Sequence, residues 1–188
     1  MGMTYEHYFS EIPCPQPNDQ LATTDLITYH TYQVTKRLLT ELIRALIDGR
    51  ANGGIGGRDM AIVEWQPNHW KVNIGIVDDH QMTGLQLATF AAYIKLDQGP
   101  FIGIFNNYAH CPDQTQSIHS KIQLQANNIM VNDTSKTFGG QQMLRTNCKK
   151  QVTLQYVAGL PYLEQRPPTK AEMMDDDIPH IIMTSEGT

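Results

Sequence analysis

The sequence predicts a mainly β fold, and three observations support this. Short apolar runs recur at close spacing between residues 61 and 105, with turn residues between them. The chain has 188 residues, of which 40% are apolar and 18% charged, enough to bury the core of one globular domain and to argue against extensive disorder. Helical spacing is confined to two stretches. The pattern is typical of a β-rich barrel or sandwich with one or two short helices.

The N-terminal part of the chain changes character near residue 26. We expect residues 1–25 to form an irregular tail, because residues 12–17 read IPCPQP. The domain is expected to span residues 26–165. Between residues 31 and 47, apolar residues recur at helical spacing, which predicts a helix to about Ile43. A short strand through Ile47 should then lead to Asp48.

The middle of the chain predicts a series of strands. The predicted strands are residues 61–65, 70–77, 84–90, 92–96 and 101–105. Turns are expected between them at residues 78–80, which read DDH, and at residues 97–100, which read DQGP.

The last third of the chain predicts one helix and further short strands. Residues 117–127 fit a helix with Ile118, Ile122 and Leu124 directed inward. Short strands should follow over residues 131–163, interrupted by glycines. Residues 166–188 are expected to be an extended linker, in which the acidic run 175–177 is a solvated loop.

Charge and cysteine content exclude some classes of function. The net charge of −5 argues against a dedicated nucleic-acid binder, and we interpret Arg145, Lys149 and Lys150 as a solvated basic turn. Three scattered cysteines give no disulfide framework, which predicts a reducing compartment and hence a cytoplasmic protein. No apolar run reaches membrane-spanning length, so no membrane partner is expected.

The main candidate site is the aspartate turn within residues 45–57, which read ALIDGRANGGIGG. An apolar pair leads into Asp48, and a glycine-rich turn follows. This arrangement is typical of the catalytic turn of an aspartic protease, since glycine allows a tight turn whose N–H groups hold the carboxylate.

Several segments, taken in order, carry a family resemblance. The chain resembles the protease segment of copia-type retrotransposon polyproteins, in a divergent branch found in algae and other protists. The segments are residues 45–57, 72–80, 99–109, 117–124, 159–163, 166–169, 178–180 and 184–185. Their order and spacing carry the resemblance more than any single motif.

The resemblance implies a fold, a function and a site. It implies a retropepsin-like closed β-barrel that works as a homodimer and cleaves junctions in its own polyprotein, without a cofactor or direct contact with nucleic acid. It implies that the protein is cytoplasmic, with virus-like particles as one location within the cytoplasm. It also implies that residues 166–188 link the domain to an integrase region of the polyprotein. Asp48 would be catalytic, and Gly49, Ala51, Asp78 and His80 would contact substrate, the last two at the base of the flap.

The chemistry requires two carboxylates that share one proton. The ionised carboxylate takes a proton from water, and the protonated one donates to the scissile carbonyl. Asp133-Thr134 lacks both the preceding apolar pair and the glycine, so Asp48 is the one good candidate. The second carboxylate should be Asp48 of another copy, across a two-fold axis.

The turn departs from the usual Asp-Ser/Thr-Gly order. Gly49 has no hydroxyl to brace the dimer, and Arg50 puts a long cation where glycine allows close packing. We therefore expect one of two outcomes: a working site with Arg50 turned outward, or an inactive remnant that serves as a structural or dimerisation module. The plain alternative is that Asp48 only caps its own turn. A third interpretation is an unrelated β-rich binding domain.

Other candidate sites have simpler explanations. His110, Cys111, His119 and Cys148 match no common zinc spacing. The glycine-rich run lacks the Gly-Lys-Ser/Thr of a phosphate-binding loop. We expect Trp65 and Trp70 to be core or dimer aromatics, and Asp78-Asp79-His80 to be a turn between strands.

Overall fold

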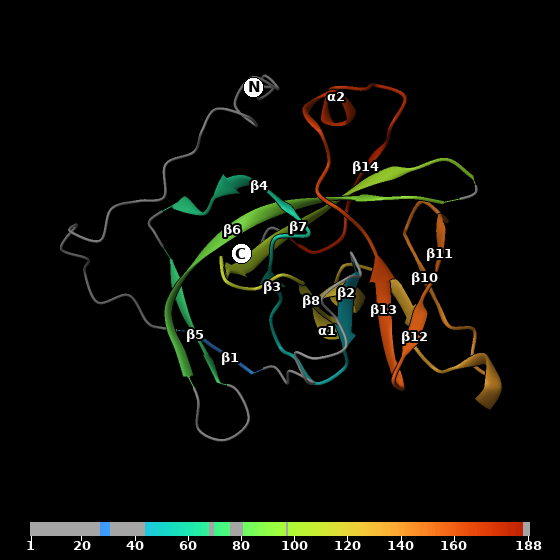
Figure 1. The fold of residues 1–188 in the computed structure, drawn as a ribbon, viewed down its shortest axis with the longest axis horizontal. Coiled ribbons are helices and arrows are strands. Elements are labelled where there is room, and N and C mark those ends of the chain that lie inside the picture. The colour runs from blue at the N-terminus through green and yellow to red at the C-terminus, as the bar shows by residue number, and fades with distance from the viewer. Residues whose placement is uncertain (1–26, 31–43, 68–69, 76–80, 97, 186–188) are drawn as a thin grey trace.

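The computed structural model describes residues 27–30, 44–67, 70–75, 81–96 and 98–185, and β-strands dominate these ranges (Figure 1). The strands are β1 (Ile27–His30), β2 (Arg44–Asp48), β3 (Ile55–Gly56), β4 (Ala61–Trp65), β5 (Lys71–Gly75), β6 (Gln81–Ile94), β7 (Phe101–His110), β8 (Ile118–Ser120), β9 (Met130–Asn132), β10 (Met143–Arg145), β11 (Gln151–Thr153), β12 (Gln155–Val157), β13 (Leu160–Glu164) and β14 (His180–Ile182). The helices are α1 (Lys121–Ala126), the 3-10 turn η3 (Lys136–Phe138) and α2 (Lys170–Met173).

Most strands belong to one large sheet, which confirms the mainly β prediction. Its order is β1-β5-β6-β7-β3-β8-β2-β13-β12, with β14 also paired to β7 and β4 to β6. A second sheet has the order β11-β10-β9. Over the described ranges the pairing does not return from β12 to β1, so the predicted closed barrel is not found there.

The long hairpin of β6 and β7 forms the centre of the large sheet (Figure 1). The prediction of two strands over residues 84–96 was wrong, because β6 is one strand of 14 residues. Residues 87–92 of β6 are all buried, so the alternation that marks a half-exposed strand is lost. A bulge between Ala88 and Phe90 bends the strand without ending it.

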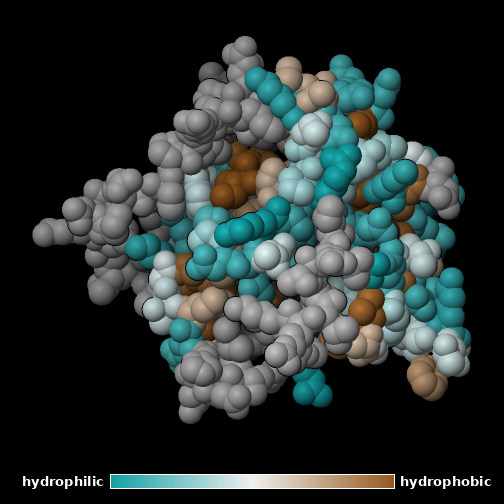
Figure 2. Space-filling model, in the orientation of Figure 1, coloured by the Kyte–Doolittle hydropathy of each residue, from teal (hydrophilic) through white to brown (hydrophobic). Residues whose placement is uncertain are grey.

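The core lies on the faces of this hairpin. Its largest fully buried side chains include Phe90, Phe101, Phe105 and Tyr108, all from β6 and β7. Leu124 of α1 and Leu163 of β13 belong to the same cluster. On the face shown in Figure 2, by contrast, hydrophobic residues form small separate groups among hydrophilic ones.

The region predicted as a helix over residues 117–127 begins as a strand. Ile118 lies in β8 and is buried, and the helix α1 starts only after Ser120, whose hydroxyl accepts the N–H of Gln123 at 3.2 Å as an N-cap. Leu124 is buried as expected, but Ile122 is 55% exposed. Because residues 118–120 form a strand, the helix begins later than predicted. Its buried face therefore includes Leu124 but not Ile122.

The C-terminal segment, expected to be an extended linker, lies against the domain. β14 pairs in parallel with β7, with His180 opposite Ile102. Met183 is fully buried, and Thr184 exchanges hydrogen bonds with Asn106: its Oγ1 accepts the Asn106 N–H at 2.7 Å and donates to the Asn106 carbonyl at 3.0 Å. The acidic run 175–177 is exposed, as predicted.

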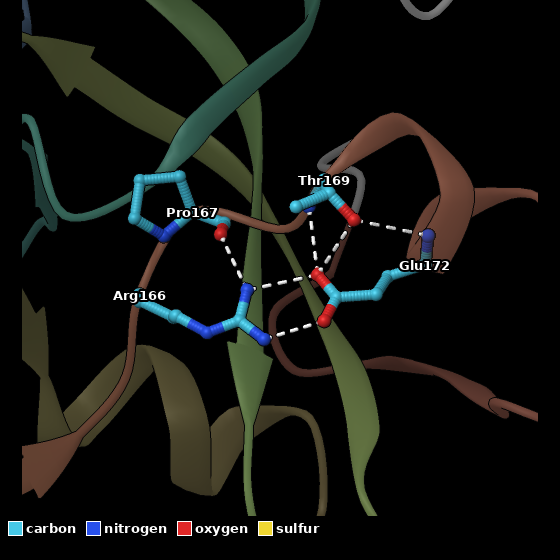
Figure 3. A network of polar contacts seen from close by, with 4 residues as sticks. All are labelled: Arg166, Pro167, Thr169 and Glu172. Atoms are coloured by element: carbon cyan, nitrogen blue, oxygen red, sulfur yellow. Dashed lines mark hydrogen bonds and ion pairs between the residues drawn. The ribbon is translucent and has the colours of Figure 1, made fainter.

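An ion pair between Arg166 and Glu172 holds the start of this segment (Figure 3). The guanidinium donates to both carboxylate oxygens, at 2.8 and 2.5 Å, and lies 3.9 Å from the centre of the Tyr93 ring. The same carboxylate accepts the N–H of Thr169, which caps α2 in a capping box. Backbone hydrogen bonds in both directions join Arg166 to Tyr93 of β6.

The remaining predictions have mixed outcomes. Strands over residues 61–65, 71–75 and 101–110 confirm three of the predicted strands, and β9 to β13 confirm the short strands over residues 131–163. The predicted tail, and the helix proposed for residues 31–43, lie outside the described residues.

Candidate aspartate turn

Asp48 lies at the carboxyl end of β2, as the sequence predicted. β2 is buried along its centre, with Ala45 at 0% and Ile47 at 2% exposure. It pairs in parallel with β8, so that Asp48 lies opposite Ser120. The carboxyl ends of two adjacent parallel strands thus meet at the aspartate, which is itself half-buried.

The turn holds the Asp48 carboxylate through backbone N–H groups. Oδ1 accepts the N–H of Arg50 at 2.7 Å and that of Ala51 at 3.3 Å. This is the geometry of an aspartate that caps its own turn. It also fixes the orientation of the carboxylate relative to the end of β2.

The two unusual residues of the turn fit without obstruction. Arg50 reaches the carboxylate with its backbone N–H, and its side chain is exposed. A Cβ on Gly49 would lie 3.8 Å from Cδ of Lys121, which is ordinary van der Waals contact. The structure therefore has the outward Arg50 that the first of the two expected outcomes requires.

Ser120 ties the turn to the neighbouring strand and helix. Its hydroxyl donates to the Ala51 carbonyl at 2.6 Å and also caps α1. Ser120 and Ala51 are both fully buried. The end of the aspartate turn is therefore fixed to the junction of β8 and α1.

The glycines after the turn allow close packing on the core. A Cβ at Gly54 would lie 2.3 Å from the Tyr108 ring, and one at Gly56 2.3 Å from the Phe90 ring. A Cβ at Gly57 would lie 2.8 Å from backbone atoms of Gln116. The glycine run thus brings the chain down onto β6, β7 and the segment before β8, and holds the turn against them.

A buried carboxylate that follows the glycine run anchors the start of β8. Asp59 is 4% exposed, and its Oδ1 accepts both the N–H and the hydroxyl of Ser117, at 2.8 and 2.6 Å. The Ser117 Oγ in turn accepts the N–H of Gly57 at 2.9 Å. Burial raises the pKa of Asp59, and the hydrogen bonds from Ser117 and Gln165 oppose that rise.

The chain of buried hydrogen bonds continues from Asp59 to β7. Gln165 Nε2 donates to Asp59 Oδ2 at 3.0 Å, and its Oε1 lies 2.9 Å from Nε2 of His119. Nδ1 of His119 lies 3.0 Å from the Tyr108 hydroxyl. A neutral imidazole that carries its proton on Nε2 satisfies both of these contacts. Burial of His119 lowers its pKa to about 4, which keeps the ring neutral.

Sequence reasoning missed this network, here called the Asp59 network: Asp59, Tyr108, Ser117, His119 and Gln165. Asp59 and Gln165 are 106 residues apart, and nothing local in the sequence marks either as buried. The only available indication was His119 in the apolar environment of a predicted core segment. The network joins the β3–β4 connection, β7, β8 with the residue before it, and the residue after β13.

The predicted substrate contacts are only partly described. Gly49 is exposed on the turn, whereas the Ala51 side chain is fully buried and faces the protein interior. Asp78 and His80 lie outside the described residues, as does Cys14. Cys111 is buried and Cys148 exposed, and both are free.

The other sequence candidates stand apart from the turn. His110 packs edge-on against Trp65, with ring centres 5.1 Å apart, and His119 belongs to the Asp59 network. Trp70 is 40% exposed. Within the described ranges, no three His, Cys, Asp or Glu side chains gather into a group that could hold a metal ion.

Comparisons with known proteins leave the chain without an assigned family. No family model, no curated protein and no solved structure matches it. None of the helices found in the described part of the chain has both the length and the apolar character needed to cross a membrane.

Proposed function

We propose that the chain is an aspartic endopeptidase of a retrotransposon polyprotein, which cleaves peptide bonds at polyprotein junctions. One observation carries the proposal: Asp48 stands at the end of a buried strand, beside a parallel partner strand, with turn N–H groups on its carboxylate. A catalytic carboxylate needs this kind of fixed, partly buried position.

The proposal requires two copies of the chain. Asp48 is the one carboxylate that this turn supplies, and the chemistry needs a second within proton-sharing distance. Two copies related by a two-fold axis would bring both Asp48 carboxylates together. One would then take a proton from the attacking water while the other protonates the scissile carbonyl oxygen.

The finer structural assignment follows from the same proposal. The domain is then retropepsin-like, and residues 72–80 correspond to the approach to its flap. Asp78 and His80 would lie at the base of the flap, and the site would be cytoplasmic.

Gly49 supports a second candidate, a retropepsin-like module without activity. The Ser or Thr that usually follows the aspartate braces the dyad across the dimer, and Gly49 supplies no hydroxyl for this. Such a module would keep the dimer and lose the hydrolysis.

Self-processing distinguishes the two candidates. The chain is expressed with its natural flanking sequence, alongside Asp48→Asn and the double exchange Gly49→Arg with Arg50→Gly, which gives the order typical of the resembling branch. Asp113→Asn, at an exposed turn, serves as the control for loss of a carboxylate. Cleavage is followed with and without pepstatin.

We expect the natural chain and Asp113→Asn to cleave, and pepstatin or Asp48→Asn to abolish cleavage. Cleavage only after the double exchange would identify a protease whose active turn has been broken. A complete absence of cleavage would contradict the proposal and support the inactive module.

A further inference from the structure

The small sheet of β9, β10 and β11 has one face in the core and one face outward. Leu144 is paired with Val131 on one side and Val152 on the other, and all three are buried. The adjacent row, Met130, Arg145 and Gln151, must point to the opposite face, because successive residues of a strand alternate. Directly opposed residues place their Cβ atoms about 5 Å apart, so this row is continuous.

A hollow lies over the end of this row. Its volume is about 430 Å³, within the range of small-molecule sites. It is lined by Asn128, Met130, Arg145, Thr146, Asn147, Lys149 and Gln151. The lining thus comes from all three strands, from the β10–β11 turn and, through Asn128, from the connection between α1 and β9.

The hollow carries a positive charge that no carboxylate of its lining balances. Arg145 and Lys149 are both exposed, and the described residues that line the hollow include no Asp or Glu. The ion pairs in the described ranges, Lys121–Asp133 and Arg166–Glu172, lie elsewhere. Among the described residues, the hydrogen-bond partner of the Arg145 guanidinium is the weakly accepting Met130 Sδ, at 3.4 Å.

The turn that carries Lys149 is held in one conformation. Thr146 N–H donates to the Lys150 carbonyl and Lys149 N–H to the Thr146 carbonyl, both at 2.9 Å. Thr146 is buried, and its Oγ1 accepts the Lys150 N–H at 3.1 Å. The backbone of the hollow is therefore formed before any ligand binds, which reduces the entropy cost of binding.

We propose that this hollow binds the oxyanion group, phosphate or carboxylate, of a small ligand. The planar fork of Arg145 suits two oxygens of such a group, and Lys149 adds a point charge. Amide side chains of Asn128, Asn147 and Gln151 supply neutral donors around it. The site is separate from the aspartate turn, so it does not depend on protease activity.

The test is titration of the full chain with inorganic phosphate, a nucleoside monophosphate and a dicarboxylate, followed by amide NMR shifts and by calorimetry at low salt. The test variant is Arg145→Gln with Lys149→Asn, because asparagine tolerates the left-handed backbone of Lys149, where φ is 68°. The control variant, Lys136→Gln with Lys170→Gln, removes two exposed cations outside the hollow.

We expect saturable binding with shifts confined to residues 128–130 and 145–151. The test variant should weaken it by roughly tenfold or more, since charge-assisted hydrogen bonds are lost, and the control should not. Tighter binding of the phosphates or of the dicarboxylate would identify the source of the oxyanion. The proposal is overturned if none of the three probes binds saturably, if the shifts fall outside residues 128–130 and 145–151, or if the test and control variants weaken binding equally.

Discussion

Gly49 and Gly56 have very different surroundings, although both belong to the glycine-rich stretch around Asp48. A Cβ at Gly49 meets Lys121 at 3.8 Å, whereas a Cβ at Gly56 would overlap the buried Phe90 ring at 2.3 Å. We expect Gly49→Ser to change the free energy of unfolding by less than about 0.5 kcal/mol. Gly56→Ala should destabilise by about 2–3 kcal/mol, because the core must shift. Urea denaturation of both variants checks this, and equal effects would contradict the described packing.

His119 makes stability depend on pH. Its pKa falls from an ordinary 6.5 to about 4 in the folded chain, so the unfolded chain binds this proton first as the pH drops. The contribution of neutral His119 to the free energy of unfolding is complete above pH 6.5. It declines as the pH falls towards 4 and does not change further below that. At about 1.4 kcal/mol per unit, the decline amounts to about 3 kcal/mol. Urea denaturation at a series of pH values measures it.

The matched variant is His119→Gln, whose amide can donate to Gln165 and accept from Tyr108 without titrating. Asp59 acts in the opposite sense: its raised pKa gives a contribution that is present at low pH and lost as the pH rises. This contribution is common to both proteins and cancels in the difference. If the difference in free energy of unfolding between the natural chain and His119→Gln does not change from pH 6.5 to 4, His119 is not a buried neutral group.

At the scale of single residues, the sequence predicts the aspartate turn but not what anchors it. Asp48 could be found because an apolar strand, an aspartate and glycines are adjacent in the chain. Asp59 and Gln165 could not, because their partners come from distant segments and a buried carboxylate has no local sequence pattern. The sequence left the direction of the Arg50 side chain open, and the structure shows that this side chain is exposed.

Among the elements, α2 depends on the ion pair between Arg166 and Glu172. Glu172 accepts both the guanidinium and the Thr169 N–H, and these contacts, led by Arg166, lower its pKa to about 2. We expect Glu172→Gln to destabilise the chain by about 1–2 kcal/mol, combining a weakened cap and a lost, partly buried ion pair. Thermal or urea denaturation measures it.

The pH dependence of the same pair has a definite sign. A depressed carboxyl pKa stabilises above its unfolded value of 4.5, and this stabilisation is lost as the pH falls towards 2. The difference in free energy of unfolding between the natural chain and Glu172→Gln should therefore become smaller below pH 4.5. Asp176→Asn, which removes an exposed carboxylate nearby in the chain, should have little effect at any pH. If Glu172→Gln and Asp176→Asn lower the free energy of unfolding equally, the Arg166–Glu172 pair contributes nothing to stability.

Strands that lie half-exposed were predictable, whereas fully buried ones were not delimited correctly. β5 alternates in burial and was found, but β6 was divided because six consecutive residues are buried. β14 was missed because its pairing with β7 links segments about 80 residues apart. Local pattern gives the existence of a strand, and tertiary pairing decides its length and its partner.

At the scale of the whole molecule, the mainly β class follows from composition and spacing, but strand order does not. The neighbours β2 and β8 are separated by the long β6–β7 hairpin in sequence, and their parallel pairing is what positions Asp48. No sequence periodicity specifies such a pairing, since it depends on which buried faces fit together.

The proposed dyad makes activity a property of two chains, and mixing tests this. If each active site needs two Asp48 carboxylates, a dimer that contains one Asp48→Asn chain is inactive. Co-refolding natural chain with an equal amount of Asp48→Asn should leave about a quarter of the sites active at fixed total concentration, because chains pair at random. An Asp113→Asn chain in the same proportion should leave activity unchanged. A fall to one half with Asp48→Asn would mean that each chain acts alone, and the symmetric dyad would then have to be abandoned.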